Sequence, residues 1–559
     1  MKRIVLFLFL LSFSNGVYSQ QNNLFEVSKN LDIYFSLFQE LSLNYADEIH
    51  PAQLTRISIE AMLKSLDPYT NYITEDQVED YRFLTSGEYG GIGVSTFQRE
   101  GHTFISEVYE ISPARQAGLK CGDRILNING ISLPGKSEED ISLLLKGESG
   151  SVLEITFDRN GMAQPKSVKI RREKISPPNV SYSGMVSDHT GLIRIEKFTE
   201  KAAEDVYNAL LKLRQEQGFR HLIIDLRGNG GGLLDQAVSV VNLFVDKGQL
   251  IVSTKGKNQD RNRSYMTMQS PVDNKIPLLI LVDESSASAS EIVAGSLQDL
   301  DRAVIMGHKT FGKGLVQNIL PLPYNHQLKI TVAKYYIPSG RCIQAVDYSD
   351  HSGKPSKTIP DSLKSLFYTR GGRMVYDGGG IEPDIEPTSN QFNPIISSMF
   401  QNYAFFDFAN EFALNHPAVP SPDSFQITQE IYKQFAEFLM KRHSGWDDQA
   451  NQVLSDLRTL LKEENRLTPE KENQIELLEK SLKGDISLAL QEARRDIEYL
   501  LRLEIITRYY YQSGRIKTLL KGDPEIEQAL AILTQPEIYK SILEGVHPEC
   551  HNRKRQDKN

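Results

Sequence analysis

Cysteine is scarce in this chain, with three residues, Cys121, Cys342 and Cys550, among 559. An odd number leaves one thiol unpaired, and the spacing fits neither a disulfide scaffold nor a zinc motif. His547, Cys550 and His551 are close together in the sequence, but the second ligand pair of a structural zinc site is missing. We therefore expect no metal site, and a flexible polar tail at the C-terminus.

An excess of positive charge is also lacking, since the formal net charge is −9. Proteins that bind nucleic acid through its phosphates usually carry a basic face, so nucleic acid is not expected as the main partner. The apolar share of 40% is sufficient for real cores. At the usual domain size, this length predicts about three or four domains.

Long hydrophobic segments are absent beyond the N-terminus. There, Lys2 and Arg3 precede the apolar run Ile4–Phe13, and Val17-Tyr18-Ser19 offers a small-residue cleavage site. A bilayer span needs about 20 apolar residues, so this shorter run predicts a secretory signal peptide over residues 1–19, with an uncleaved anchor as the alternative. No cysteine follows the run, so a bacterial lipid anchor is not indicated. We expect an exported protein, periplasmic or membrane-peripheral.

A serine-rich junction lies near the middle of the chain. The run Ile276–Val282 predicts a buried strand, Ser285–Glu291 follows it, and the next residues to Leu300 predict a helix. A hydroxyl at such a junction, with small neighbours, can act as a nucleophile when a base takes its proton. The serines could instead only cap the helix. Ser286, Ser288 and Ser290 are all chemically possible nucleophiles.

A lysine follows soon after, in the segment Thr310-Phe311-Gly312-Lys313-Gly314, and Gln317 comes four residues later. A neutral lysine is able to accept the proton of a serine hydroxyl. His308 and Lys309 are rival bases by sequence position, although residues at the end of a strand more often face solvent.

A second strand, turn and helix precede the serine junction. His221–Leu226 predicts a core strand, Arg227–Gly232 a glycine-rich turn, and Leu233–Val245 a helix. Glycines leave amides uncovered at the positive end of a helix, which makes an anion site. Neither the nucleotide-loop nor the dinucleotide pattern is present, so a phosphate ligand is not indicated. A tight turn without a ligand is the alternative.

A third pattern covers residues 86–175. The segment Glu88–Val94 contains Gly90, Gly91, Ile92 and Gly93, and is followed by Ile111–Leu119 and Gly122–Gly130. Consecutive amides in such a loop can bind a terminal carboxylate, and a strand beginning at Ile92 offers an edge to an extended peptide. This region is similar to a PDZ domain over its whole length. A tight hairpin with core residues is the alternative.

A short helix is expected beside that edge. Ser137 can cap it, Ile141, Leu143 and Leu144 are predicted to face the groove, and Gly147 ends it. Such a groove favours an apolar last residue in the bound peptide.

The remaining regions differ in their periodicity. Residues 20–85 have helical spacing that Asp67-Pro68 breaks, with an apolar face that packs on the protein or on a second copy. Residues 176–390 alternate strands and helices. Residues 391–559 are helical, followed by the polar tail, and either cover the active site or bind a partner.

The order of these motifs resembles the C-terminal processing, or tail-specific, serine proteases. The resemblance implies that Ser288 is the nucleophile, Lys313 the base and Gln317 the residue that orients the lysine, with the family's spacing of 25 and four residues. It also implies an oxyanion hole formed by Ala289 with Gly231 or Gly232. Among the three serines, the resemblance alone selects Ser288.

The predicted architecture is an α/β protease core, a strand–turn–helix sandwich over residues 176–390. It is preceded by a PDZ domain and flanked by helical N- and C-terminal regions. The predicted function is an exported Ser-Lys endopeptidase that recognises unstructured C-termini through Gly90, Gly91, Ile92, Gly93 and Val94, with no cofactor. Its expected partners are unfolded or tailed proteins, with an adaptor protein and a homo-oligomer left open. The alternatives are a non-catalytic peptide- or ligand-binding protein on the same fold, and a hydrolase of small esters.

Overall fold

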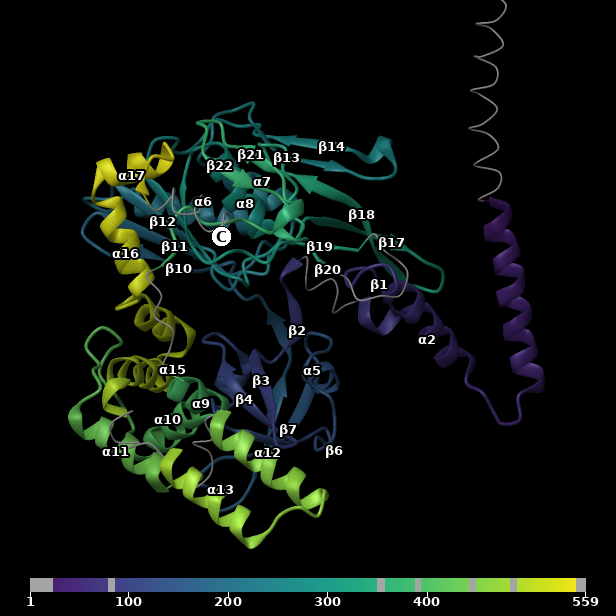
Figure 1. The fold of residues 1–559 in the computed structure, drawn as a ribbon, viewed down its shortest axis with the longest axis vertical. Helices are drawn as coiled ribbons and strands as arrows, with labels where there is room; N and C mark the ends of the chain where they lie inside the picture. The colour runs from purple at the N-terminus through teal and green to yellow at the C-terminus, as the bar shows by residue number, and fades with distance from the viewer. Residues whose placement is uncertain are drawn as a thin grey trace, which may run out of the picture. The chain divides into compact units, whose positions relative to one another are not determined.

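The computed structural model describes residues 24–78, 86–348, 357–387, 394–441, 449–482 and 490–548 (Figure 1). The contacts divide the chain into two compact units. The first comprises residues 1–73, 319–331 and 348–354, and the second contains the rest. The predicted signal peptide, Cys550 and His551 lie outside the described residues.

The first unit is mainly helical. A helix over residues 24–44 is followed by α2 (Pro51–Lys64) and by the short strand β1 (Asn71–Ile73), which pairs antiparallel with Gln327–Lys329. The helical spacing ends at Asp67-Pro68, and β1 follows that break. The reason is a turn in which the Asp67 carboxylate accepts the N–H groups of Tyr69 and Thr70, both over 2.8 Å.

The second unit begins with a PDZ-like sheet in the order β3-β4-β5-β7-β8, with β6 paired to β5. Its core contains Ile105, Ile128, Leu153 and Ile155, which are fully buried. The two-stranded sheet β2-β9 leads into and out of this region. The bounds are β2 (Tyr89–Gly91), β3 (Val94–Arg99), β4 (His102–Val108), α4 (Pro113–Gln116), β5 (Arg124–Ile128), β6 (Ile131–Ser132), α5 (Glu138–Leu145), β7 (Val152–Asp158), β8 (Lys166–Arg171) and β9 (Glu173–Ile175).

A five-stranded sheet in the order β10-β11-β12-β15-β16 forms the centre of the second unit, and all its neighbours are parallel except β10 and β11. Nearly every residue of β11, β12, β15 and β16 is buried, as expected for parallel strands covered on both faces. The bounds are β10 (Val180–Met185), β11 (Thr190–Ile195), α6 (Ala202–Leu213), β12 (His221–Asp225), α7 (Leu234–Asn242), β15 (Leu278–Val282), α8 (Ala289–Asp299) and β16 (Val304–Gly307).

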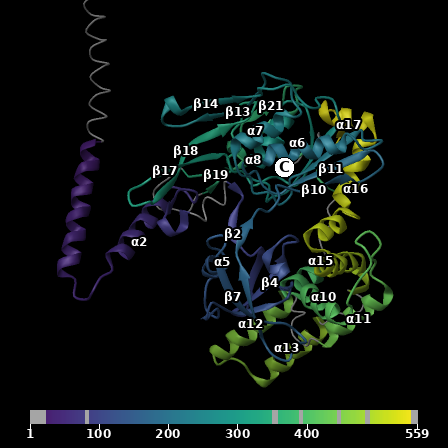
Figure 2. The same cartoon turned by 180° about the vertical axis from the view of Figure 1, so that it is seen from behind.

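Helices cover both faces of this sheet (Figures 1 and 2). Alternate strand residues such as Ile224 and Ile280 pack on α6, α7 and α8. Their neighbours Ile223 and Leu279 pack on the C-terminal helices α16 (Pro524–Leu533) and α17 (Pro536–Leu543). The last segment of the chain is therefore one layer of the core, a role distinct from the two that the sequence left open.

Further strands flank the sheet. Strand β13 pairs with β14 and with Lys334–Tyr336 of β18, both antiparallel. The bounds are β13 (Leu250–Lys255), β14 (Arg263–Met266), β17 (Leu315–Pro321), β18 (Gln327–Tyr336), β19 (Val346–Asp347), β20 (Lys357–Thr358), β21 (Leu366–Tyr368) and β22 (Met374–Tyr376).

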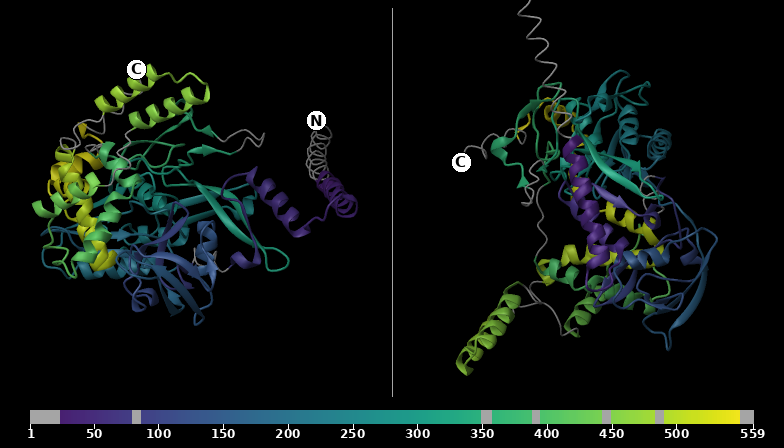
Figure 3. Two further views of the ribbon diagram at one scale, coloured as in Figure 1. Left: turned by 90° about the horizontal axis from the view of Figure 1, so that it is seen from below. Right: turned by 90° about the vertical axis from the view of Figure 1, so that its right-hand side faces the viewer.

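The C-terminal region is helical, as predicted, and has its own aromatic core around Phe405, Phe408 and Phe435. Helices α12 and α13 lie side by side (Figure 3). The bounds are α9 (Pro394–Gln401), α10 (Ala404–Asn415), α11 (Gln429–Lys441), α12 (Gln449–Glu463), α13 (Pro469–Leu482) and α15 (Arg494–Leu520).

Candidate active site

Ser288 lies at the junction between β15 and α8, where it precedes the first helical residue. Its backbone has φ 58° and ψ −110°, a region that residues with a side chain rarely occupy. Strained conformations of this kind persist where the surrounding structure holds them, often at active sites. The predicted strand, turn and helix around Ser288 are thus present.

The three candidate nucleophiles of the junction, Ser286, Ser288 and Ser290, have different surroundings. Ser286 is fully buried and donates from Oγ to the carbonyl of Leu226 over 2.8 Å. Ser290 is also fully buried and donates to the carbonyl of Asn229 over 2.9 Å. Ser288 alone of the three is partly exposed. Burial and hydrogen bonding thus distinguish Ser288 from the other two candidates.

The glycine turn after β12 touches the serine junction directly. A side-chain carbon on Gly231, which has φ 99°, would lie 2.9 Å from the amide nitrogen of Ala289 and 2.5 Å from the carbonyl oxygen of Ala287. Gly232 has φ 149° and a side chain there would meet the Phe198 carbonyl at 2.3 Å. Only glycine fits at these two positions.

Asn229 binds the two turns together. Its carbonyl accepts the N–H of Ala287 over 3.0 Å as well as the Ser290 hydroxyl, and its Oδ1 accepts the N–H of Gly231 over 2.9 Å. Its side-chain amide donates to Ile195 on β11 over 2.8 Å. The N–H of Gly231 therefore already donates a hydrogen bond to Asn229 Oδ1. The N–H of Ala289 lies against the glycine turn.

Glu291 links the serine junction to the lysine loop. One carboxylate oxygen, Oε2, accepts the N–H of Ser288 over 2.8 Å and that of Lys313 over 2.9 Å. The other, Oε1, accepts the Thr310 hydroxyl over 2.6 Å and the N–H of Gly312 over 2.7 Å. Burial raises the pKa of Glu291 to about 7, against the lowering effect of these four donors.

Tyr335 makes a second link between the same two segments. Its hydroxyl contacts the carbonyl of Lys313 over 2.5 Å and that of Ser288 over 3.2 Å. The backbones of residues 288 and 313 are therefore held by shared partners on both their N–H and their C=O groups. Lys313 and Gln317 are both half-buried.

The two rival bases, His308 and Lys309, lie at the surface. His308 and Lys309 follow β16 and are exposed, as predicted, and Lys309 is 3.4 Å from Glu382. Sequence reasoning missed Glu291 and Tyr335. The first had a signal, because glutamate three residues after Ser288 is the spacing of a capping box. Tyr335 had none, because its contacts come from distant segments.

A groove of about 380 Å³ runs between β3 and α5 in the PDZ-like region. Ile92, Gly93 and Val94 line it, whereas Gly90 and Gly91 belong to β2 and pair with β9. Because β3 pairs with β4 on one side and ends the sheet order, its other edge faces the groove. This edge is available to an extended peptide.

The residues that α5 presents to the groove differ from the prediction. Glu138, Ser142 and Leu145 line it, while Ile141 is buried in the core and Leu143 is 45% exposed. The reason is the phase of the helix: it begins at Glu138, so positions four and seven residues later lie on the same face.

The two cysteines that the structure describes are not paired with each other and are partly buried. Cys121 and Cys342 are free thiols, and burial raises the pKa of both, for Cys121 to about 11. Within the described ranges, no group of three or more His, Cys, Asp and Glu side chains is arranged to hold a metal ion. No helix in those ranges is long and apolar enough to cross a membrane.

Three protein-family models match this chain. Peptidase family S41 matches residues 189–351, a PDZ domain matches residues 104–159, and the C-terminal helical domain of probable PDZ-proteases matches residues 395–533. The predicted PDZ domain and protease core are thereby confirmed.

Individual relatives agree with these matches. A carboxy-terminal-processing protease of Bartonella bacilliformis is 34% identical over 353 residues, which cover 63% of this chain and 80% of that protein. A probable CtpA-like serine protease of Staphylococcus epidermidis is 33% identical over 346 residues, covering 60% and 69%. Among solved structures, a photosystem II D1 C-terminal processing protease is 26% identical, covers 63% of this chain and 86% of that one, and has a TM-score of 0.37.

Proposed function

Because this chain belongs to peptidase family S41, the carboxy-terminal-processing serine proteases, and carries a PDZ domain, we propose that it is an exported Ser-Lys endopeptidase. In this proposal the PDZ groove captures unstructured protein C-termini, and the protease core cleaves the chain upstream of the captured end. The observation that carries it is that Ser288, unlike the buried candidates Ser286 and Ser290, is partly exposed and lies against Gly231 of the glycine turn.

The proposed reaction uses Ser288 as nucleophile and Lys313 as base. The Ser288 oxygen forms a bond to the peptide carbonyl carbon while neutral Lys313 takes the hydroxyl proton. Lys313 then gives that proton to the leaving amine as the C–N bond breaks, and water hydrolyses the acyl-enzyme by the same proton route in reverse. Gln317 orients the lysine. The support is that Glu291 and Tyr335 fix the backbones of residues 288 and 313 together.

The oxyanion is assigned to the N–H of Ala289 together with that of Gly231 or Gly232. The contact between the glycine turn and the Ala289 amide supports this assignment. The amide of Gly231 donates to Asn229, which favours Gly232 as the second donor. One such donor typically contributes about 2.7–4 kcal/mol to transition-state stabilisation.

The two ends of the groove carry different charges, and we propose that this difference selects the peptide tail. Leu145 and Lys146 line one end, where Lys146 lies 5.8 Å from the ring centre of Tyr89, near the glycine loop. Glu138 and Glu139 line the other end. We assign the terminal carboxylate and an apolar last side chain to the first end, and a basic residue upstream to the second.

The spacing fits this arrangement. In an extended peptide every second side chain points to the same face, so the last and third-from-last side chains are about 7 Å apart. Leu145 and Glu138 are seven residues apart, or about 10 Å along the helix. A long Lys or Arg side chain, third from the end, covers the difference.

The proposal of export rests on residues 1–19, which carry the features of a signal peptide. An enzyme exported in this way is periplasmic or membrane-peripheral. A non-catalytic binding protein on this fold has no use for the strained Ser288 and its shared contacts with Lys313. A small-ester hydrolase has no use for the groove beside β3.

The test compares one unfolded protein substrate that carries a free apolar C-terminus with the same substrate amidated at that end. We expect the free form to be cleaved at least several-fold faster at sub-saturating concentration, because amidation removes the carboxylate. A peptide containing the same cleavage sequence but no tail measures cleavage without capture. Equal rates for all three substrates contradict the tail-recognition proposal, and no cleavage of any contradicts the enzyme proposal.

A further inference from the structure

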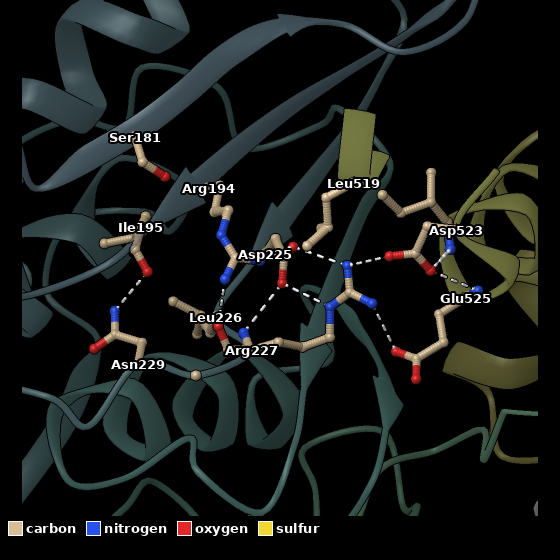
Figure 4. Close-up of polar contacts among 12 residues, drawn as sticks. Ser181, Arg194, Ile195, Asp225, Leu226, Arg227, Asn229, Leu519, Asp523 and Glu525 are labelled. Atoms are coloured by element: carbon tan, nitrogen blue, oxygen red, sulfur yellow. Dashed lines mark hydrogen bonds and ion pairs between the residues drawn. The ribbon is translucent and has the colours of Figure 1, made fainter. Parts of the chain in front are cut away.

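A group of charged side chains surrounds Arg227, the first residue of the glycine turn (Figure 4). At its centre is Arg227, the residue immediately before Gly228, with 14% of its side chain exposed. Its N–H and its Nε both donate to Asp225 Oδ1, over 3.0 and 2.9 Å, and its Nη2 donates to Oδ2 over 2.9 Å. Asp225 is fully buried at the end of β12.

Arg194 holds the same group from β11. Its Nη1 donates to Asp225 Oδ2 over 2.7 Å, and its Nη2 donates to the carbonyl of Arg227 over 3.1 Å. Burial alone would raise the pKa of Asp225, yet it lies below its usual value because both arginines stabilise the carboxylate. Residue 227 is thus fixed at its N–H, its C=O and its side chain.

The outer side of the Arg227 guanidinium faces the C-terminal helix α16. Nη2 lies 2.8 Å from Asp523 Oδ2, and Nη1 lies 3.1 Å from Glu525 Oε2. Asp523 is also the N-cap of α16, since its Oδ1 accepts the N–H groups of Glu525 and Ile526. The helix therefore fixes the carboxylate that pairs with Arg227.

Asp523 and Glu525 are not needed to neutralise the two arginines of this group. Arg194 and Arg227 are already balanced by Asp225 and by Glu196, which lies 2.8 Å from Arg194 Nε. Asp523 and Glu525 add two negative charges, and burial raises the pKa of Glu525 against the effect of Arg227. Removing their charge leaves no unpaired arginine, so their contribution is to orient Arg227 and to join it to α16.

From Arg227 the contacts continue to the nucleophile. The N–H of Gly228 donates to Asp283 on the serine junction over 3.0 Å, and Asn229 accepts from Ala287 and Ser290. A rotation at residue 227 would move the amides that face Ala289 and Ser288. Misplacement by about 1 Å can lower a catalytic rate about 100-fold.

We propose that Arg227, Asp523 and Glu525 form a clasp that positions the oxyanion turn, so that docking of α16 on the sheet sets the catalytic competence of the site. Arg227 is a positioning residue in this scheme, and it does not touch the substrate. The proposal rests on the assignment of residues 231, 232 and 289 as oxyanion donors.

The test uses Asp523→Asn with Glu525→Gln in the full chain. Asparagine caps a helix as well as aspartate does, so α16 keeps its N-cap while the ion pairs are lost. Glu527→Gln, an exposed residue in the first turn of the same helix, is the matched control. We expect kcat on a tailed substrate to fall about 10-fold, with KM and the Kd of a tail peptide unchanged and with the control at wild-type rate.

Two further readouts separate positioning from loss of folded protein. Titration with a peptide boronate, which adds to the serine and places an oxygen in the oxyanion hole, is expected to show the same fraction of active sites and an affinity about 10-fold weaker. Hydrogen exchange of the amides of residues 228–233 is expected to become faster in the double variant. Loss of kcat explained entirely by fewer active sites, or unchanged exchange and unchanged kcat, contradicts the clasp. Because exchange needs no catalysis, an inactive wild-type protein would overturn the proposed function while leaving this readout in place.

Discussion

The two turns at the carboxyl ends of β12 and β15 share one design, a buried parallel strand followed by a turn and a helix. They are held in different ways. The serine turn is fixed by Glu291 from its own helix, whose carboxylate also binds the lysine loop. The glycine turn is fixed by Arg227, whose partners Asp523 and Glu525 come from a helix about 300 residues later.

The difference indicates how each turn depends on the rest of the chain. The serine turn is held by contacts within the protease core, which come from Glu291, Tyr335 and Asn229. The glycine turn is held in part by the C-terminal layer, so its geometry depends on how α16 packs. Substitutions at the serine turn should therefore lower the catalytic rate directly. Substitutions at the contacts of the glycine turn should lower it by changing how α16 packs on the sheet.

The largest effect is expected at the lysine. Lys313→Arg should be as inactive as Lys313→Ala, at least about 100-fold below wild type, because a guanidinium keeps its charge and cannot act as a base. Initial cleavage rates between pH 6 and 10 measure this, and the wild-type rate should rise toward alkaline pH. The matched control is Lys309→Arg, which should keep wild-type activity. An active Lys313→Arg, or a profile lost in His308→Ala, would point to a different base.

A smaller effect is expected at Glu291. Glu291→Gln replaces one acceptor oxygen by an amide group that faces N–H donors, so activity should fall about 10- to 100-fold. Glu284→Gln, at an exposed position in the same turn, should be unaffected.

The same variant tests the raised pKa of Glu291, about 7 in the folded protein against a usual value of 4.5. A carboxyl group that binds its proton more tightly when folded stabilises the protein fully below the unfolded pKa and loses that contribution as pH rises through the folded pKa. The unfolding free energy of the wild type, relative to Glu291→Gln, should therefore fall by about 1–3 kcal/mol between pH 4.5 and 7. Urea unfolding at several pH values measures it. A difference that does not vary with pH would show that folding does not change the pKa of Glu291.

The smallest effect is expected in the groove, whose lining residues belong to neither turn. With Ser288→Ala protein, a tail peptide with Lys third from its end should bind about 2- to 5-fold more tightly than one with Glu there, and the preference should shrink as salt is added. Glu138→Gln with Glu139→Gln should remove the preference, and Glu154→Gln, at an exposed position of β7 that does not line the groove, should keep it. Fluorescence anisotropy measures the Kd values. Equal binding of the two peptides in low salt would exclude an acidic end to the groove.

Much of this arrangement could be predicted from the sequence. Glycines next to a buried strand and small residues around Ser288 are local signals. They predict the positions of both turns and of the PDZ region. The groove face of α5 was mispredicted, because Leu143 was assumed to face the peptide and the helix phase depends on where it begins. Glu291 had a recognisable spacing that was not used.

The clasp could not be predicted. Arg227 is a common residue in a turn, and Asp523 is an ordinary helix cap with proline after it. Only the packing of α16 on the sheet brings them together, and nothing near either residue in the sequence encodes that contact. Tyr335 is comparable, since its hydroxyl reaches residues 288 and 313 from a separate strand.

The most direct test of the central claim is the cleavage rate of an unfolded, tailed substrate by Ser288→Ala beside the wild type. The account predicts that wild-type protein cleaves it, and that Ser288→Ala has no measurable activity while binding the tail peptide with unchanged Kd. Tail binding thereby reports that the variant is folded. Cleavage by Ser288→Ala at the wild-type rate would show that another residue is the nucleophile and would contradict the account.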